Sequence, residues 1–141
     1  MKMNQYINFY MNNPTKGGAD GTVISTDNAE NAPLAVTLDA SQNESKIVKV
    51  AVRCEAGFQA EAGTIIYASG TTASKWSFAL DNDYADATEA ASAVFGANIT
   101  INDIIDTTNT IFWAKATASS DENPGTDITV NLVCRATITP V

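Results

Sequence analysis

Two cysteines, Cys54 and Cys134, stand out because a cysteine thiolate can act as a nucleophile or bind a metal. The chain contains no histidine, the commonest general base and the commonest metal ligand. A Ser-His-Asp or Cys-His device therefore cannot be built within it, and the cysteine spacing does not fit a zinc site. Two interpretations remain, namely buried thiols in a reducing compartment or a disulfide across the fold.

Carboxylates form the second candidate for chemistry. Asp81, Asn82 and Asp83, with Asp86 close by, make an oxygen-rich segment of the kind that binds calcium. The segment lacks the glycine and the terminal glutamate of an EF-hand loop, so a solvated acidic loop is the competing interpretation. A second acidic group flanks another turn and consists of Asp121, Glu122 and Asp127. No motif surrounds any of these acids, and we expect no catalytic residues, no cofactor and no metal.

Charge narrows the range of partners. The 141 residues carry a formal net charge of −8, and the eight basic residues are scattered along the chain. Nucleic-acid binding needs clustered Lys and Arg to displace counterions, and an anionic membrane would repel this chain. No apolar run reaches the length of a membrane span, and the first six residues do not resemble a signal peptide. We expect synthesis in a cytoplasm, with no nucleic-acid or membrane partner.

Period-two alternation of apolar residues predicts β-strands along most of the chain. Residues 47–54 place Val48, Val50, Val52 and Cys54 on one face. Residues 128–138 continue such a pattern over a whole strand, with Cys134 on the inward face. Shorter candidate strands are 6–11, 22–26, 34–39, 64–68, 74–81, 99–104 and 110–117. Both cysteines should therefore point into the core.

The two tryptophans lie on different kinds of strand. Trp76 alternates with Phe78 and Leu80, which predicts that these three side chains share a buried face. Trp113 follows Phe112, so both faces of the strand at 110–117 carry an aromatic residue. One of those aromatics is expected either to contact a partner protein, as large exposed apolar groups often do, or to be covered by a loop.

These strands and the turns between them predict an all-β fold in a single domain, residues 1–141. Turn residues such as Asn12, Asn13 and Pro14 separate the strands, and no βαβ alternation indicates a parallel sheet. Eight or nine short strands are typical of an antiparallel β-sandwich. Residues 83–97 are alanine-rich and predict one or two helical turns or a long loop. Residues 1–11 are a candidate N-terminal arm or edge strand for pairing with a partner.

Several stretches resemble a group of short virion-associated proteins of bacteriophages. They are YINFYMNNPT at 6–15, GGADGT at 17–22, VAVRCE at 50–55, KWSFAL at 75–80, TIFWAKATA at 110–118 and DENPGTD at 121–127. The resemblance is one of pattern over most of the chain rather than of a diagnostic motif. It implies an immunoglobulin-like β-sandwich on a phage particle, as in capsid decoration or cement proteins. Such proteins bind through their surfaces, so no residue of this chain inherits a catalytic role.

Three functional hypotheses compete, and they predict different behaviour. A decoration protein would bind the assembled shell of major capsid protein in many copies and would locate to the virion, alone or as a homo-oligomer. A tail, baseplate or head-fibre module would be present in few copies and would bind host carbohydrate, for example by stacking Trp76 or Trp113 on sugar rings. A small cell-wall hydrolase would need a cleft and a carboxylate with a raised pKa.

Overall fold

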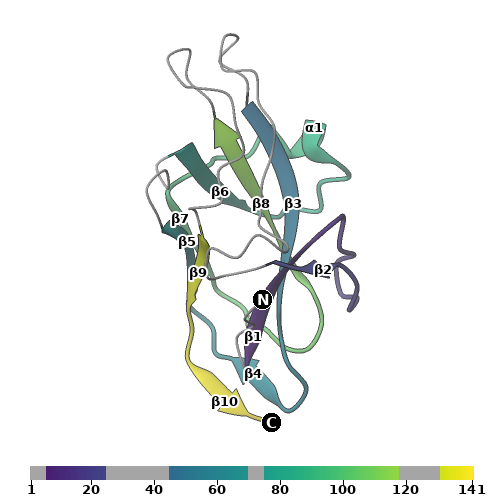
Figure 1. The fold of residues 1–141 in the computed structure, drawn as a ribbon, viewed down its shortest axis with the longest axis vertical. Coiled ribbons are helices and arrows are strands. Elements are labelled where there is room, and N and C mark those ends of the chain that lie inside the picture. The colour runs from purple at the N-terminus through teal and green to yellow at the C-terminus, as the bar shows by residue number, and fades with distance from the viewer. Residues whose placement is uncertain (1–5, 25–44, 70–74, 118–130) are drawn as a thin grey trace.

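The computed structural model describes residues 6–24, 45–69, 75–117 and 131–141 (Figure 1). Those ranges form ten strands and one short helix. In chain order they are β1 (Ile7–Met11), β2 (Thr22–Val23), β3 (Ser45–Cys54), β4 (Phe58–Ala60), β5 (Thr64–Ser69), β6 (Trp76–Leu80), α1 (Ala87–Ala90), β7 (Asn98–Ile101), β8 (Thr110–Thr117), β9 (Asn131–Arg135) and β10 (Ile138–Pro140).

The strands assemble into three antiparallel sheets. A five-stranded sheet has the order β2-β1-β3-β8-β6, a three-stranded sheet the order β7-β5-β9, and β10 pairs with β4. Every strand pairing in the described ranges is antiparallel. The five-stranded and three-stranded sheets lie on opposite sides of the main core (Figure 1). The predicted all-β class with antiparallel sheets is therefore confirmed.

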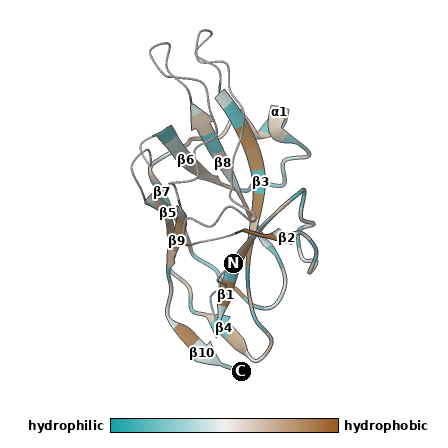
Figure 2. Ribbon diagram, viewed as in Figure 1, coloured by the Kyte–Doolittle hydropathy of each residue, from teal (hydrophilic) through white to brown (hydrophobic). Residues whose placement is uncertain are grey.

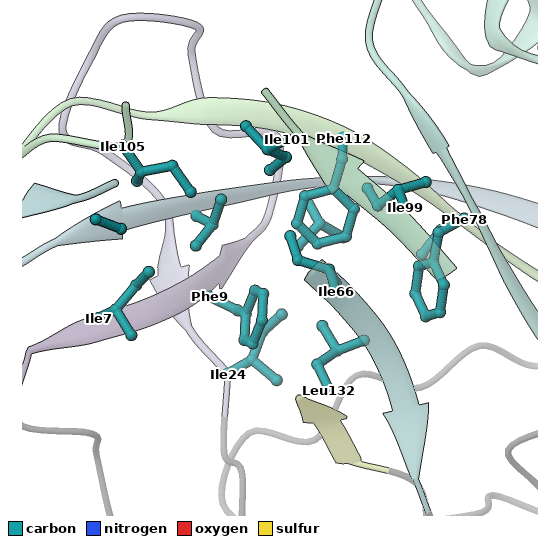
Figure 3. Packing of buried hydrophobic residues seen from close by; sticks show 14 of the residues in the cluster. Ile7, Phe9, Ile24, Ile66, Phe78, Ile99, Ile101, Ile105, Phe112 and Leu132 are labelled. Carbon is teal, nitrogen blue, oxygen red and sulfur yellow. The ribbon is translucent and has the colours of Figure 1, made fainter. Parts of the chain in front are cut away.

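The main core fills the space between these two sheets. Val50 and Val52 of β3 are fully buried there, and Ile66 of β5 faces them from the three-stranded sheet. Figure 3 shows Phe9, Phe112 and other apolar side chains from both sheets converging on this layer. Burial of such side chains stabilises the fold by roughly 1.5–3 kcal/mol each. The alternation predicted for β3 is thus confirmed.

A second apolar cluster covers the opposite face of the five-stranded sheet. Ala51, Ile111 and Trp113 point away from the main core and are buried by residues 84–95. Helix α1 lies in this covering segment, beside β3 (Figure 1). Its single turn begins at the N-cap Asp86, whose side chain accepts a hydrogen bond from the Glu89 amide. The helical turn expected in the alanine-rich segment is present, within a longer connection.

Several strand predictions need correction. Residues 128–138 do not form one strand, because β9 pairs with β5 and β10 pairs with β4, and the chain changes partner between them. The inward face was nevertheless predicted correctly, since Leu132, Cys134, Ala136 and Ile138 all pack on the main core. Strand β4 was not predicted at all. The candidate strand 34–39 lies outside the described residues.

Leu80 also differs from its prediction. Phe78 is fully buried, but Leu80 is 47% exposed because it ends β6, the edge strand of its sheet. Ala79, which alternation assigned to the outer face, is buried opposite Trp113. The reason is that both faces of this sheet are covered, so simple alternation of buried and exposed residues does not apply.

The described part of the N-terminal segment forms a strand of the five-stranded sheet. Strand β1 lies inside the five-stranded sheet, between β2 and β3, with Phe9 and Tyr10 buried. It pairs with β3 from Ile7↔Cys54 to Tyr10↔Ala51. Strand β2 pairs only with Tyr10 and Met11 among the residues described, and the hypothesis that the N-terminal segment pairs with a partner stays a prediction. Residues 1–5 lie outside the described ranges.

Candidate functional surfaces

The acidic segment after β6 does not bring its carboxylates together. Asp81 accepts hydrogen bonds from the indole nitrogen of Trp113 (2.9 Å) and from the Tyr84 amide (3.3 Å). Asp83 pairs with Lys16, and Asp86 caps α1. In the described parts of the chain, no three Cys, Asp or Glu side chains are grouped to hold a metal ion. These acids therefore shape the connection that covers the sheet.

The other acidic group cannot be placed in the same way. Asp121, Glu122 and Asp127 lie outside the described residues.

The two cysteines both reach the main core, from opposite sheets. Cys54 is buried at the end of β3, and its thiol donates to the Ile105 carbonyl oxygen at 3.4 Å. Cys134 lies on β9 and packs against the same core. Both are free thiols in this structure, so the cross-fold disulfide is not formed. Burial, with a smaller contribution from Cys54, raises the pKa of Cys134 to about 11. A thiol with that pKa is protonated at neutral pH and a poor nucleophile.

The tryptophans are not arranged as a binding platform. Trp113 is only 2% exposed and lies beneath residues 84–95, with the Tyr84 ring edge-on at 6.3 Å. The expectation that the outer aromatic of β8 contacts a partner is therefore wrong, and the alternative of a covering loop is correct. Trp113 cannot stack on a sugar ring in this arrangement. Trp76 is half-buried against the main core.

Sequence reasoning missed a polar network built around Arg53. The Arg53 guanidinium lies 3.5 Å from the centre of the Tyr10 ring. It donates to the Asp20 carbonyl oxygen at 2.8 Å and to the Asn109 side-chain oxygen at 2.7 Å. Arg53 thereby joins β3, the loop between β1 and β2, and the residue before β8. Stacking on the Tyr10 ring and two hydrogen bonds from one guanidinium nitrogen hold Arg53 in a fixed orientation.

Asn109 completes this network from a nearly fully buried position. Its side-chain nitrogen donates to the Thr15 carbonyl oxygen at 2.9 Å and to the Asp20 carboxylate at 3.0 Å. Asp20 also accepts from the Thr15 amide and hydroxyl, and these hydrogen bonds lower the pKa of Asp20. The network fastens residues 12–21 to the sheet. No local motif announces it, because its members come from distant parts of the chain.

A more exposed surface is the outer side of the three-stranded sheet. Strand register places Ile65 and Tyr67 at its centre, with Val133 and Arg135 on β9 beside them. The three uncharged side chains are only partly buried, and Arg135 is exposed. Its guanidinium lies 6.0 Å from the centre of the Tyr67 ring. Asn98 and Thr100 of β7 border the surface on the other side. We call these six residues the β5 face.

A half-exposed sheet usually presents mainly polar side chains to solvent. The centre of the β5 face departs from that pattern, because the middle strand presents isoleucine and tyrosine. Tyrosine and arginine are also the residue types that contribute most often to binding energy at protein interfaces. The β5 face is therefore the candidate binding surface of the described structure (Figure 2 shows the hydropathy of each strand).

No helix in the described ranges is long and apolar enough to cross a membrane. Comparison of the chain with models of protein families finds no match, and comparison with curated proteins finds none either.

Proposed function

We propose that the chain is a structural protein of a bacteriophage particle, with an immunoglobulin-like sandwich that binds the assembled shell as a decoration or cement protein. The sequence resemblance supports the phage assignment, and the all-β fold is compatible with it. The observation that carries the binding role is the β5 face, where Tyr67 and its apolar neighbours remain partly exposed on a sheet. Such a surface suits contact with another protein.

The internal organisation supports the same role. The five-stranded sheet is packed on both faces, and the Arg53 network fastens the loop at residues 12–21 to it. A protein that reinforces a shell has to keep its own shape while it is bound, and extensive packing provides that rigidity. The expected partner is the major capsid protein, and self-association into a homo-oligomer is compatible with the proposal.

The alternative is a tail, baseplate or head-fibre module that binds host surface carbohydrate. Tyr67 favours it, because the aromatic ring is partly exposed and Asn98 and Thr100 lie on the same face. Aromatic rings beside amide and hydroxyl groups can bind sugars. The burial of Trp113 removes one of the two tryptophans that the sequence suggested for that purpose.

Copy number in purified particles separates these functions. The protein should be quantified by mass spectrometry relative to the major shell protein. A ratio near one copy per shell subunit, or a simple fraction of it, supports decoration. A handful of copies per particle supports the tail or fibre alternative. Complete absence from the particles contradicts both.

A further inference from the structure

The β5 face has an unusual charge for this protein. The chain has 16 acidic and eight basic residues, yet β5, β7 and β9 contain no acidic residue. Their one charged residue is Arg135, and within the described ranges no carboxylate forms an ion pair with it. An acidic protein thus presents one sheet face that is apolar at its centre and positive at its edge.

The outer face of the five-stranded sheet differs from the β5 face because the chain itself covers it. There Ile111 and Trp113 are buried by the chain's own residues 84–95. On the β5 face, Ile65, Tyr67 and Val133 keep part of their surface accessible, and Arg135 is exposed. A partner protein that covered this face would bury the apolar centre and exclude water from around the guanidinium. An arginine in such surroundings gains most from a carboxylate that it can bind through two parallel hydrogen bonds.

We propose that the β5 face docks onto an acidic protein surface, with Arg135 opposite a carboxylate and Tyr67 against an apolar area. This inference rests on the proposed function, so the partner is the outer surface of the assembled shell. Charge favours this occupant over a second copy of the chain. In two copies docked through the same face, β5, β7 and β9 would offer no carboxylate to pair with the Arg135 of either copy. The net charge of the whole chain is −8, so an acidic partner is repelled by the rest of the molecule. That repulsion favours docking through the β5 face, where the charge is positive.

Charge reversal at Arg135 tests the inference with a matched control. Arg135→Glu and Lys46→Glu both change the formal net charge from −8 to −10, since each replaces one positive charge by a negative one. Lys46 is exposed on β3, in the other sheet. A third variant, Tyr67→Thr, removes the aromatic ring but keeps a residue that favours strands. Circular dichroism and thermal unfolding establish that each variant is folded.

Binding of each protein to purified shells lacking the native protein is then measured by co-sedimentation over a concentration series. We expect Arg135→Glu and Tyr67→Thr to raise the Kd at least about tenfold. Lys46→Glu should change it by less than about twofold. Raised salt should narrow the difference in Kd between wild type and Arg135→Glu, because salt screens the interaction of this one side chain with the partner's carboxylate.

The outcomes distinguish failure of this docking inference from failure of the proposed decoration function. If wild type binds shells and both β5-face variants bind equally well, the docking face is wrong and the decoration role stands. The same conclusion follows if Lys46→Glu weakens binding as much as Arg135→Glu. If wild type does not bind shells at all, the proposed function is wrong and the inference fails with it. If sedimentation shows a dimer that Arg135→Glu dissociates, the face belongs to a second copy and the inference is also overturned.

Discussion

Replacing Asn109 with alanine tests whether the polar network holds residues 12–21 on the sheet. The Asn109 side chain donates to the Thr15 carbonyl oxygen and to both the carbonyl and the carboxylate of Asp20, and it accepts from Arg53. Alanine removes all of these contacts from a site where Asn109 is only 4% exposed. The Thr15 carbonyl, the Asp20 oxygens and the Arg53 guanidinium then each lose one hydrogen-bonding partner.

The size of the effect follows from those contacts. A net hydrogen bond contributes roughly 0.5–1.5 kcal/mol, and leaving a buried partner unsatisfied costs about 1–3 kcal/mol. Asp20 and Arg53 can recover part of this loss from water, because neither residue is fully buried. We therefore expect Asn109→Ala to lower the free energy of unfolding by about 2–4 kcal/mol. In a domain of this size, the Tm should fall by roughly 5–15 °C.

Urea unfolding followed by tryptophan fluorescence measures this loss. The matched control is Asn98→Ala, the same chemical change at an exposed position of β7. The control should change the free energy of unfolding by less than about 0.5 kcal/mol. A loss for Asn109→Ala no larger than that of the control would refute the view that this network stabilises the fold.

Three further predictions concern backbone conformation and the thiols. Gly21 has φ +107°, and a Cβ there would lie 3.0 Å from the Tyr10 Cβ, whereas Gly57 has φ +93° with nothing within 4 Å. Gly21→Ala should therefore lower the free energy of unfolding by roughly 2–4 kcal/mol and Gly57→Ala by about 1 kcal/mol in urea unfolding, and equal losses would contradict this. Burial raises the pKa of Cys134 from 9.0 to about 11, so the unfolded chain releases this proton first as pH rises. The stabilising contribution is complete below pH 9 and declines by roughly 2–3 kcal/mol as pH rises through about 11. Wild type should lose stability over that range relative to Cys134→Ala, and parallel curves would disprove the assignment. Burial also raises the pKa of Cys54, so iodoacetamide should modify native protein near pH 8 much more slowly than urea-unfolded protein, and equal rates would show that the thiols are accessible.

Alternation of apolar residues along a strand predicted burial correctly where one face of the strand packs on the core. The alternation in β3 identified Val50, Val52 and Cys54 as core residues because one face of that strand meets the opposite sheet. The same reasoning failed at Leu80, where the strand lies at a sheet edge, and at Ala79, where a second cluster covers the outer face. Which faces are covered depends on how distant segments fold back, and a strand's own sequence does not contain that information.

The candidate surfaces likewise depend on contacts between distant segments, which the sequence did not predict. The sequence indicated that Asp81 and Asp83 belong to an acidic connection, but not that the indole of Trp113 binds one of them. The Arg53 network joins residues that are neighbours only after the sheet has formed. The β5 face emerges from strand register, because it takes Tyr67 and Arg135 from different strands that pair with each other. Spacing along the chain could not have placed them side by side.

The position of strand β8 determines how slowly its backbone amides exchange with solvent. It has β3 on one side and β6 on the other, and its side chains enter both apolar clusters, with Phe112 in one and Trp113 in the other. Its backbone amides cannot reach solvent by fraying from an edge or by detachment of a single covering layer. Exchange of these amides with deuterium requires opening of much of the sheet, so β8 belongs to the most slowly exchanging part of the protein. Residues 84–95, by contrast, pack on the second cluster alone, so we expect their amides to exchange faster than those of β8.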